Sequence, residues 1–341
     1  MATQKVYMVI GGGGFLGRYI VDFLLNRGEK NVKIFDLRKT FDDPRVDYIL
    51  GDITKVDDLK KAFVGVQCVI HTASSTHNVH NHDLVFKINV QGTKNVIEAC
   101  VASGVKELVY TSSASVVFDG NDLKNATEEA PYAKAHFDDY SHTKQLAEEA
   151  VIAANGKGGL MTVAIRPSGI FGPRDVQAWP GFLGAAKDGA NKFAINGNNY
   201  FDWTYVENVA YGHVLASDKL TQGSKVGGQV YNITNDEPEK FWNMAIYVFK
   251  SFGYSEPKYY LPYLPLYYFA LVFGFVCNLL GLKLKFLETF TPLRICNAGA
   301  TRTFSCEKAK RELGYKPIVS LDEGKKRTLE YFQQLRKEGK I

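Results

Sequence analysis

Cysteine is scarce in this sequence, and the excess of positive charge is small. The five cysteines among 341 residues are odd in number and widely spaced, and no two of them form a C-x-x-C pair. They indicate neither a disulfide framework nor a zinc site, which suits a reducing compartment. The net charge is +5, yet no run of lysine and arginine has the form of a nucleic-acid footprint. We expect no metal centre and no nucleic-acid partner.

Signals for export and repetition are also missing. The first apolar strand begins within six residues of the start, so we expect no secretory signal and a catalytic part that faces the cytosol. No internal repeat or low-complexity segment interrupts the chain. Hydrophobic residues at 45% and charged residues at 23% describe an ordinary folded protein.

The most informative stretch is the beginning of the chain. A short apolar run, Val6–Ile10, leads through four glycines into a segment with apolar residues at helical spacing. Backbone N–H groups at the start of such a helix, with no Cβ atoms in front of them, can bind a pyrophosphate. Gly11, Gly14 and Gly17 have the spacing G-x-x-G-x-x-G, and Asp36 ends the second strand about 20 residues later. This combination predicts binding of a dinucleotide.

Strands and helices alternate over the first half of the chain, which is the pattern of a doubly wound parallel sheet. The sequence therefore predicts an α/β fold of Rossmann type with a smaller C-terminal substrate domain. We place the dinucleotide-binding domain at 1–167, with 203–235 returning to it, and the substrate domain at 168–202 and 236–341.

Ligands of such sheets bind where the strands end. Asp52 follows one strand and is a candidate for the adenine edge or, equally, a turn acid. Small residues such as Ala73 follow the next strand and leave room for a cofactor, and one long helix containing Asn89 is expected to run on to Ala102. The cofactor-binding candidates are Gly11, Gly14, Phe15, Leu16, Gly17, Asp36, Asp52, Ile53, Ala73, Tyr140, Lys144 and Pro167.

A tyrosine and a lysine four residues apart carry the expected chemistry. Tyr140 and Lys144 share one face of a predicted helix. Lowering a tyrosine pKa by about three units requires roughly 4 kcal/mol of preferential stabilisation of the phenolate, and an ammonium one turn away is a source of it. Tyr140 would then take the proton of an alcohol while its hydride leaves for a nicotinamide cofactor. Ser113 ends the preceding strand, where its hydroxyl can hold the same oxygen.

With these residues in place, the sequence resembles the extended short-chain dehydrogenase/reductase family, and within it the 3β-hydroxysteroid dehydrogenase group. The resemblance covers essentially the whole chain. It is carried by GGGGFLG at 11–17, HTAS at 71–74, NVQGT at 89–93, YTSSASVVF at 110–118, YSHTK at 140–144, RPSGIFGP at 166–173, DWTYVENVAYGHVLA at 202–216 and FSCEKAKRELGYKP at 304–317.

The resemblance implies that Ser113, Tyr140 and Lys144 are catalytic, with Lys144 also holding the nicotinamide ribose. It implies that Asp36 binds the adenosine ribose, so that NAD is preferred, although Arg38 leaves NADP open. The implied reaction is that of the decarboxylating members of the group. They oxidise the 3β-hydroxyl of a 4α-carboxysterol to the ketone with loss of CO₂, a C4-demethylation step of sterol biosynthesis.

Three alternatives stay open. A 3β-hydroxysteroid dehydrogenase/Δ5-4 isomerase needs a second acid–base group, which the sequence does not locate. A nucleotide-sugar epimerase usually carries an asparagine where this chain has Ser168. A non-enzymatic sensor of NAD tends to have lost one of the three catalytic residues. The group that binds the 4α-carboxylate is equally open, between Arg174, Lys187 and Arg294.

Residues 259–282 contain no charged side chain. Because Pro262 and Pro265 break the first part, the sequence predicts a helix over Leu266–Leu282, which is at the short limit for a bilayer at about 1.5 Å per residue. The segment can span a membrane, lie in one leaflet or line the substrate pocket. We favour the leaflet, because the tail with helix 321–335 is expected to pack back on the substrate domain.

The expected partners follow from these features. They are a sterol substrate, the surface of the endoplasmic reticulum membrane or of a lipid droplet, and, by resemblance only, a second copy of the chain in a homodimer.

Overall fold

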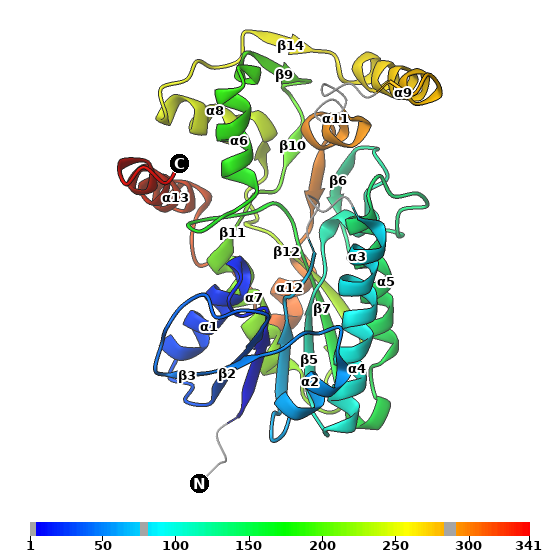
Figure 1. Ribbon diagram of the computed structural model, residues 1–341, viewed down its shortest axis with the longest axis vertical. Coiled ribbons are helices and arrows are strands. Elements are labelled where there is room, and N and C mark those ends of the chain that lie inside the picture. Colours follow the sequence, from blue (N-terminus) through cyan, green and yellow to red (C-terminus); the bar gives the residue numbers. More distant parts are fainter. Residues whose placement is uncertain (1–4, 76–80, 283–290) are drawn as a thin grey trace.

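A seven-stranded parallel sheet forms the centre of the computed structural model, which describes residues 5–75, 81–282 and 291–341 (Figure 1). The strand order is β12-β7-β5-β4-β1-β2-β3. The strands are β1 (Tyr7–Ile10), β2 (Val32–Asp36), β3 (Val46–Leu50), β4 (Cys68–His71), β5 (Glu107–Thr111), β7 (Met161–Pro167) and β12 (Gln229–Ile233). The prediction of a Rossmann-type α/β fold is confirmed.

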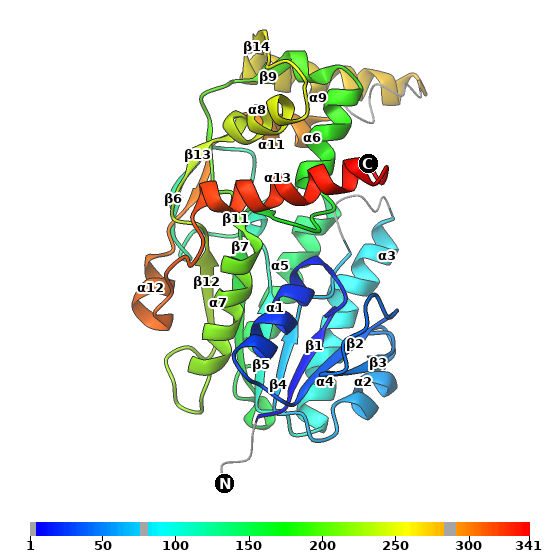
Figure 2. The same ribbon diagram turned by 90° about the vertical axis from the view of Figure 1, so that its left-hand side faces the viewer.

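Helices cover both faces of this sheet (Figures 1 and 2). Helices α1 (Phe15–Asn26) and α7 (Val206–Lys219) pack together on one face, where Ile20 and Val209 belong to the same buried cluster. Helices α2 (Val56–Ala62), α4 (Thr93–Ala102) and α5 (Asp139–Ala153) cover the other face through a second cluster. Apolar strands buried on both faces are what a parallel sheet requires.

The expected single helix leading to Ala102 is three consecutive segments instead. They are α3 (His82–Phe86), a π-helical turn η1 (Lys87–Gly92) and α4. The side chain of Asn89 in the π-helical turn bonds to two other segments. It accepts from the backbone N–H of Ser75 at 2.7 Å and donates to Thr143 Oγ1 at 3.0 Å. Such bulges often mark functional sites, and sequence periodicity does not reveal them.

A second part of the molecule is built on a four-stranded sheet of order β13-β10-β15-β6. Its strands come from distant places in the chain, namely β6 (Leu123–Ala126), β10 (Tyr200–Phe201), β13 (Glu239–Lys240) and β15 (Arg302–Phe304). Two short pairs accompany it. They are β8 (Ile170–Phe171) with β11 (Thr204–Tyr205), and β9 (Phe193–Ile195) with β14 (Tyr259–Leu261).

Helices of the second part are α6 (Ala178–Lys187), α8 (Phe241–Ser251), α9 (Tyr263–Leu279) and α11 (Pro292–Gly299). After them come α12 (Glu307–Leu313), which packs on α7 and β12, and α13 (Leu321–Lys337). The chain therefore crosses between the two parts several times. The domain boundaries placed at 167, 202 and 235 stay a prediction.

Helix α9 differs from the helix predicted at Leu266–Leu282. It begins at Tyr263 and ends at Leu279, because Pro265 lies in the first turn, where a missing N–H and a fixed φ do no harm. Figure 1 shows α9 projecting from one end of the molecule. Only Ala270 and Cys277 among its residues are buried. Within the described ranges, no helix combines the length and the apolarity needed to cross a membrane.

Candidate active site

A cavity of about 1420 Å³ runs along the carboxyl ends of the central strands and continues into the second part of the molecule. Every residue that the sequence predicted for catalysis or cofactor binding lines it. They are Gly11, Gly14, Phe15, Leu16, Gly17, Asp36, Asp52, Ile53, Ala73, Ser113, Tyr140, Lys144 and Pro167. Their roles stay predictions, but the structure brings all of them to one continuous space.

The glycine turn between β1 and α1 has the form of a phosphate cradle. A Cβ on Gly17 would lie 2.1 Å from the carbonyl oxygen of Gly11, so only glycine allows this approach of helix to strand. Gly11 itself has a φ of +77°. No side chain of the described residues caps α1, and its first residues line the cavity. The N–H groups of that turn therefore suit the pyrophosphate of a dinucleotide.

Asp36 lies at the end of β2, where an adenosine ribose is expected. Its Oδ2 accepts the Gly13 N–H at 3.0 Å, which fixes the carboxylate beside the glycine turn. Arg38, which left NADP open, does not line the cavity, and its carbonyl accepts the hydroxyl of Tyr48 at 2.8 Å. Asp52 caps its own turn by accepting the Thr54 N–H at 2.8 Å, and it lines the cavity as well.

Tyr140 stands in the first turn of α5. Asp138 caps that helix by accepting the Ser141 N–H at 2.6 Å. Burial raises the pKa of Tyr140 to about 12, the charge of Asp138 adds to this rise, and a hydrogen bond with Ser113 opposes it. The Ser113 hydroxyl thus lies within hydrogen-bonding reach of Tyr140, and its expected contact with the substrate oxygen stays a prediction. Deprotonation of Tyr140 near neutral pH requires positive charge at the site.

Lys144 is buried one turn further along α5, with 2% of its surface exposed. Its Nζ donates to the carbonyl of Thr111 and lies 4.3 Å from the centre of the Tyr110 ring. Burial lowers the pKa of Lys144 to about 7, while the Glu148 carboxylate acts in the opposite direction. The Lys144 amine is thus fixed one helical turn after Tyr140, and it can lose its proton near neutral pH.

Residues that sequence reasoning missed hold this lysine in place. Thr111 Oγ1 donates to His213 Nε2 at 2.7 Å, because His213 Nδ1 carries its proton toward the carbonyl of Val209 at 2.8 Å. Burial lowers the pKa of His213 to about 4, so the ring stays neutral at physiological pH. Position 213 lies in the motif quoted above, but the motif does not show which residue its side chain contacts.

A buried ion pair lies behind the same helix. Glu148 accepts from Arg166 Nε at 2.9 Å and Nη2 at 2.5 Å, and from the hydroxyl of Tyr132 at 2.7 Å. Both charged side chains are almost fully buried. The intact pair connects α5 to β7. Loss of either partner would leave an uncompensated buried charge and destabilise this contact.

Aromatic side chains line the half of the cavity that lies in the second part. They come from α6, the link between β10 and β11, and α8, and they are Phe182, Trp203, Phe241, Trp242 and Phe249. Trp203 and Phe241 have ring centres 5.3 Å apart. Flat, apolar walls of this kind suit a rigid apolar ligand. No local pattern could identify these residues from the sequence, because they come from separate segments.

Three cations lie on the described wall of the cavity: Lys87, Lys144 and Arg294. Of the three residues that the sequence left open for the 4α-carboxylate, only Arg294 lines this wall. Arg174 bonds to Asp22 at 3.4 Å and lies over the Tyr19 ring, away from the cavity. Among the described residues, no group of three or more His, Cys, Asp or Glu side chains could hold a metal ion.

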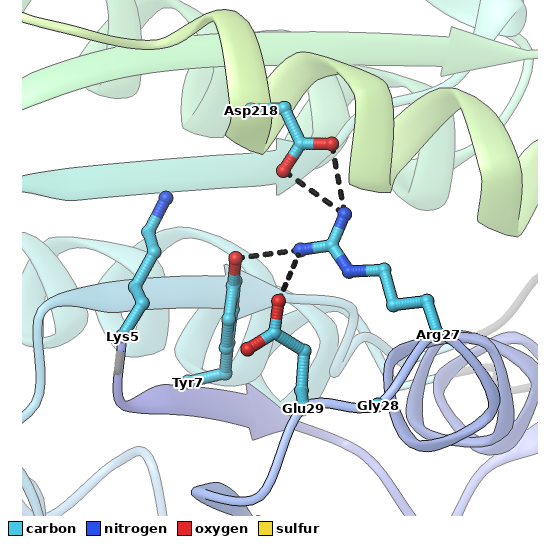
Figure 3. Close-up of a pocket in the computed structure, with 6 residues that line it drawn as sticks. All are labelled: Lys5, Tyr7, Arg27, Gly28, Glu29 and Asp218. Atoms are coloured by element: carbon cyan, nitrogen blue, oxygen red, sulfur yellow. Dashed lines mark hydrogen bonds and ion pairs between the residues drawn. The ribbon is translucent and has the colours of Figure 1, made fainter. Parts of the chain in front are cut away.

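A second, smaller pocket of about 600 Å³ lies at the opposite, amino end of the sheet (Figure 3). Figure 3 shows Arg27 in contact with Asp218, Glu29 and Tyr7. Arg27 bonds both carboxylate oxygens of Asp218 at 2.8 and 3.0 Å, Glu29 at 3.0 Å and the Tyr7 hydroxyl at 2.7 Å. These contacts join α1 to α7, and we assign this pocket a structural role.

Comparison with known proteins gives a family and several relatives. A profile of the 3-beta hydroxysteroid dehydrogenase/isomerase family matches residues 8–264. The chain is 46% identical to mouse sterol-4-alpha-carboxylate 3-dehydrogenase, decarboxylating, over 99% of this chain and 94% of the mouse protein. It is 45% identical to the human protein of the same name, over 96% and 88% of the two chains.

Solved structures share the fold at lower identity. A dTDP-glucose 4,6-dehydratase from Streptomyces venezuelae, solved with NAD, matches with a TM-score of 0.75 and 21% identity over 97% of this chain and 98% of that one. A UDP-glucose 4-epimerase from Thermotoga maritima matches with a TM-score of 0.74, also at 21% identity, over 97% and 99%. At such identities the likeness shows the fold alone.

Proposed function

The chain belongs to the 3-beta hydroxysteroid dehydrogenase/isomerase family, and we propose that it oxidises the 3β-hydroxyl of a 4α-carboxysterol with NAD and releases CO₂. The relatives named above are called sterol-4-alpha-carboxylate 3-dehydrogenase, decarboxylating, and they match over nearly the full length of both chains. The observation that carries the proposal is the single cavity, which joins the glycine turn, Tyr140 and an aromatic slot.

Separate residues of the protein act on the oxygen atom of the 3β-hydroxyl. Tyr140 accepts the proton of the 3β-hydroxyl, and Ser113, bonded to Tyr140, holds the same oxygen. Lys144 supplies the positive charge that stabilises the phenolate, and its fixation on Thr111 keeps it in place. The Gly11–Gly17 turn and Asp36 would bind NAD, which when bound supplies the acceptor for the hydride that leaves C3.

Loss of CO₂ follows from the product of the first step. Oxidation turns the 4α-carboxylate into a β-keto acid. When the bond from C4 to the carboxyl carbon breaks, its electron pair moves into an enolate whose oxygen lies beside Tyr140 and Ser113. Their hydroxyl groups can stabilise that oxyanion, and Tyr140 can return its proton. No metal is required by this sequence of steps.

NAD, not NADP, is the preferred cofactor in this proposal. The Asp36 carboxylate at the end of β2 would repel a 2′-phosphate, and the Arg38 side chain is not part of the cavity wall. A comparison of kcat/KM for the two cofactors tests this preference directly. A higher value for NADP would contradict it.

A lipid surface is the proposed partner of α9. Its exposed side chains include Leu264, Phe269, Val272, Phe275 and Leu279, and the uncharged segment is preceded by Lys258. This composition suits insertion into one leaflet. We place the protein on the endoplasmic reticulum membrane or on lipid droplets, with its catalytic part toward the cytosol. Release from membranes by a carbonate wash would contradict an embedded helix.

A homodimer is proposed by family resemblance, and sedimentation velocity tests it.

One assay tests the reaction. Purified protein is given NAD and a 4α-carboxysterol labelled at the carboxyl carbon. We expect NADH and labelled CO₂ in a ratio of one to one. NADH from a simple 3β-hydroxysteroid, with none from the carboxysterol, would instead identify a dehydrogenase/isomerase. No turnover of either, with cofactor bound, would favour a nucleotide-sugar epimerase.

A further inference from the structure

The mouth of the cavity at its substrate end lies at the base of α9. Phe193 and Arg294 both line the cavity and are exposed at the surface. The Phe193 ring stacks on Tyr259 with ring centres 5.5 Å apart, and Tyr259 precedes α9 by four residues. Leu266, on the first turns of α9, lines the cavity as well. The opening and the exposed apolar helix therefore share one surface of the molecule.

Helix α9 is held at a fixed place relative to this mouth. The hydroxyl of Tyr263 in its first turn lies 2.9 Å from the carbonyl of Gly120 and 3.3 Å from Cys296 Sγ. Cys296 belongs to α11, the helix that also carries Arg294. A lipid surface that receives the outer face of α9 would thus meet the mouth of the cavity at the same time.

Among the described cations that line the cavity, Arg294 is the one at this mouth. Lys144 is buried beside Tyr140, and Lys87 belongs to η1 in the cofactor half. Within the part of the chain that the structure describes, the Arg294 guanidinium has no hydrogen bond or ion pair, while its backbone N–H bonds Thr291 in the helix cap. An exposed guanidinium at the entrance of an apolar cavity attracts a carboxylate and raises its local concentration.

We propose that the sterol enters the cavity from the lipid with its polar end first, and that Arg294 captures the 4α-carboxylate at the mouth. This inference rests on the proposed function. A 4α-carboxysterol in a membrane keeps its hydroxyl and carboxylate at the lipid surface and its apolar tail in the lipid. Entry at the mouth carries C3 toward Tyr140 and leaves the tail directed toward α9. The molecule does not have to turn over on the way.

Capture at the entrance predicts a change in kcat/KM and not in kcat. We expect Arg294→Gln to lower kcat/KM for the carboxysterol about tenfold at low salt, with kcat unchanged and a weaker dependence on ionic strength. Inhibition by a 4α-methyl 3β-hydroxysterol, which has no carboxylate, should not change. Arg174→Gln is the control for loss of one positive charge, because Arg174 is a half-buried cation that pairs with Asp22 and does not line the cavity.

The route from the lipid has its own test. Phe275 is 69% exposed on α9 and does not line the cavity. We expect Phe275→Glu to lose turnover of carboxysterol presented in phosphatidylcholine vesicles while it keeps turnover of the same sterol delivered by cyclodextrin. An equal loss with both, or no loss with either, would overturn entry from the lipid.

The outcomes separate the two proposals. If the wild-type protein forms NADH and CO₂ but Arg294→Gln is unaffected, or loses the neutral sterol equally, the inference fails and the proposed function stands. If the wild-type protein with bound NAD forms neither product, the proposed function fails and the inference fails with it.

Discussion

At the scale of single residues, the site disfavours the charged forms of both Tyr140 and Lys144. Burial raises the pKa of Tyr140 and lowers that of Lys144, so each group is driven toward its neutral form. The chemistry needs the reverse, a phenolate beside an ammonium. Hydrogen bonds from Ser113 and to the Thr111 carbonyl hold the pair in position. The phenolate–ammonium pair that the reaction needs therefore depends on the charge that bound substrate and cofactor bring to the site.

Replacement of the proton acceptor tests the central role in the reaction. We expect Tyr140→Phe to lower kcat roughly 10²- to 10⁴-fold, because the alcohol loses its general base, while NAD affinity by calorimetry stays within a few-fold. Tyr200→Phe, at an exposed tyrosine outside the cavity, serves as control. Turnover near the wild-type rate in Tyr140→Phe would refute the assignment.

Removal of the buried lysine should raise stability in a pH-dependent way. The folded-state pKa of Lys144, about 7, is below its unfolded value of 10.5, so the folded state binds fewer protons between these pH values and the wild type gains stability as pH rises through them. The penalty is fully present below pH 7. We expect Lys144→Met to be more stable by roughly 1–4 kcal/mol at pH 6, with the difference shrinking by pH 9.

Urea unfolding at pH 6, 7.5 and 9 measures this difference. A gap between variant and wild type that stays constant over this range would show that the lysine charge is not the cause. The variant should also be inactive, which separates the stability of the fold from the needs of the reaction.

At the scale of elements, the turn from β1 to α1 shows how closely helix and strand approach. A Cβ on Gly17 would meet backbone atoms of Gly11 and Gly12 below 3 Å, and backbone cannot move aside as a flexible side chain can. Gly184 on α6 differs, since a Cβ there meets no atom within 4 Å. The two glycines thus make a matched pair, one required by contact and one not.

We expect Gly17→Ala to lose several kcal/mol of stability, about 2–4, together with NAD binding, because α1 must move away from the strand. Gly184→Ala should be neutral or more stable by about 0.5–1 kcal/mol, since alanine is the better helix former. Thermal unfolding with and without NAD measures both. A Gly17→Ala protein with wild-type stability would disprove the contact argument.

The residues predicted from local sequence patterns are ones that the structure brings together, and their roles stay predictions. Short stretches of sequence are enough to identify the glycine spacing, Asp36 at the end of a strand and the i,i+4 pair of Tyr140 and Lys144. All of these residues line one cavity. The aromatic wall of the cavity could not be predicted from the sequence, because Trp203 and Phe249 come from separate segments that only the fold brings together. The start of α9 was misplaced because Pro265 was taken as a break, whereas it lies in the first turn.

At the scale of the whole molecule, each of the two parts is built from several separate stretches of the chain. Strand β12 and helix α7 complete the first sheet from residues after 200, and β6 pairs with β15 across nearly 180 residues. Without α7, one face of β5 and β7 and the apolar side of α1 would be open to water. Neither part then has a complete core of its own.

A fragment of residues 1–167 should therefore not fold by itself. We expect it to be insoluble, or to lack a cooperative thermal transition by circular dichroism, because the edge strand β7 and the α7 side of the sheet are exposed. The same fragment co-expressed with residues 168–341 should be recovered in soluble form. A cooperative transition in the isolated fragment would contradict this expectation.

The late position of β15 has a consequence for synthesis on the ribosome. Helix α9, with its exposed leucines and phenylalanines, leaves the exit tunnel before Cys296 and β15 do. During that interval the first turn of α9 cannot yet pack against α11. The four-stranded sheet also still lacks β15, the strand that joins β10 to β6. The nascent chain therefore displays the exposed apolar side chains of α9 while the fold is incomplete. We expect it to need a chaperone or a membrane surface before translation ends.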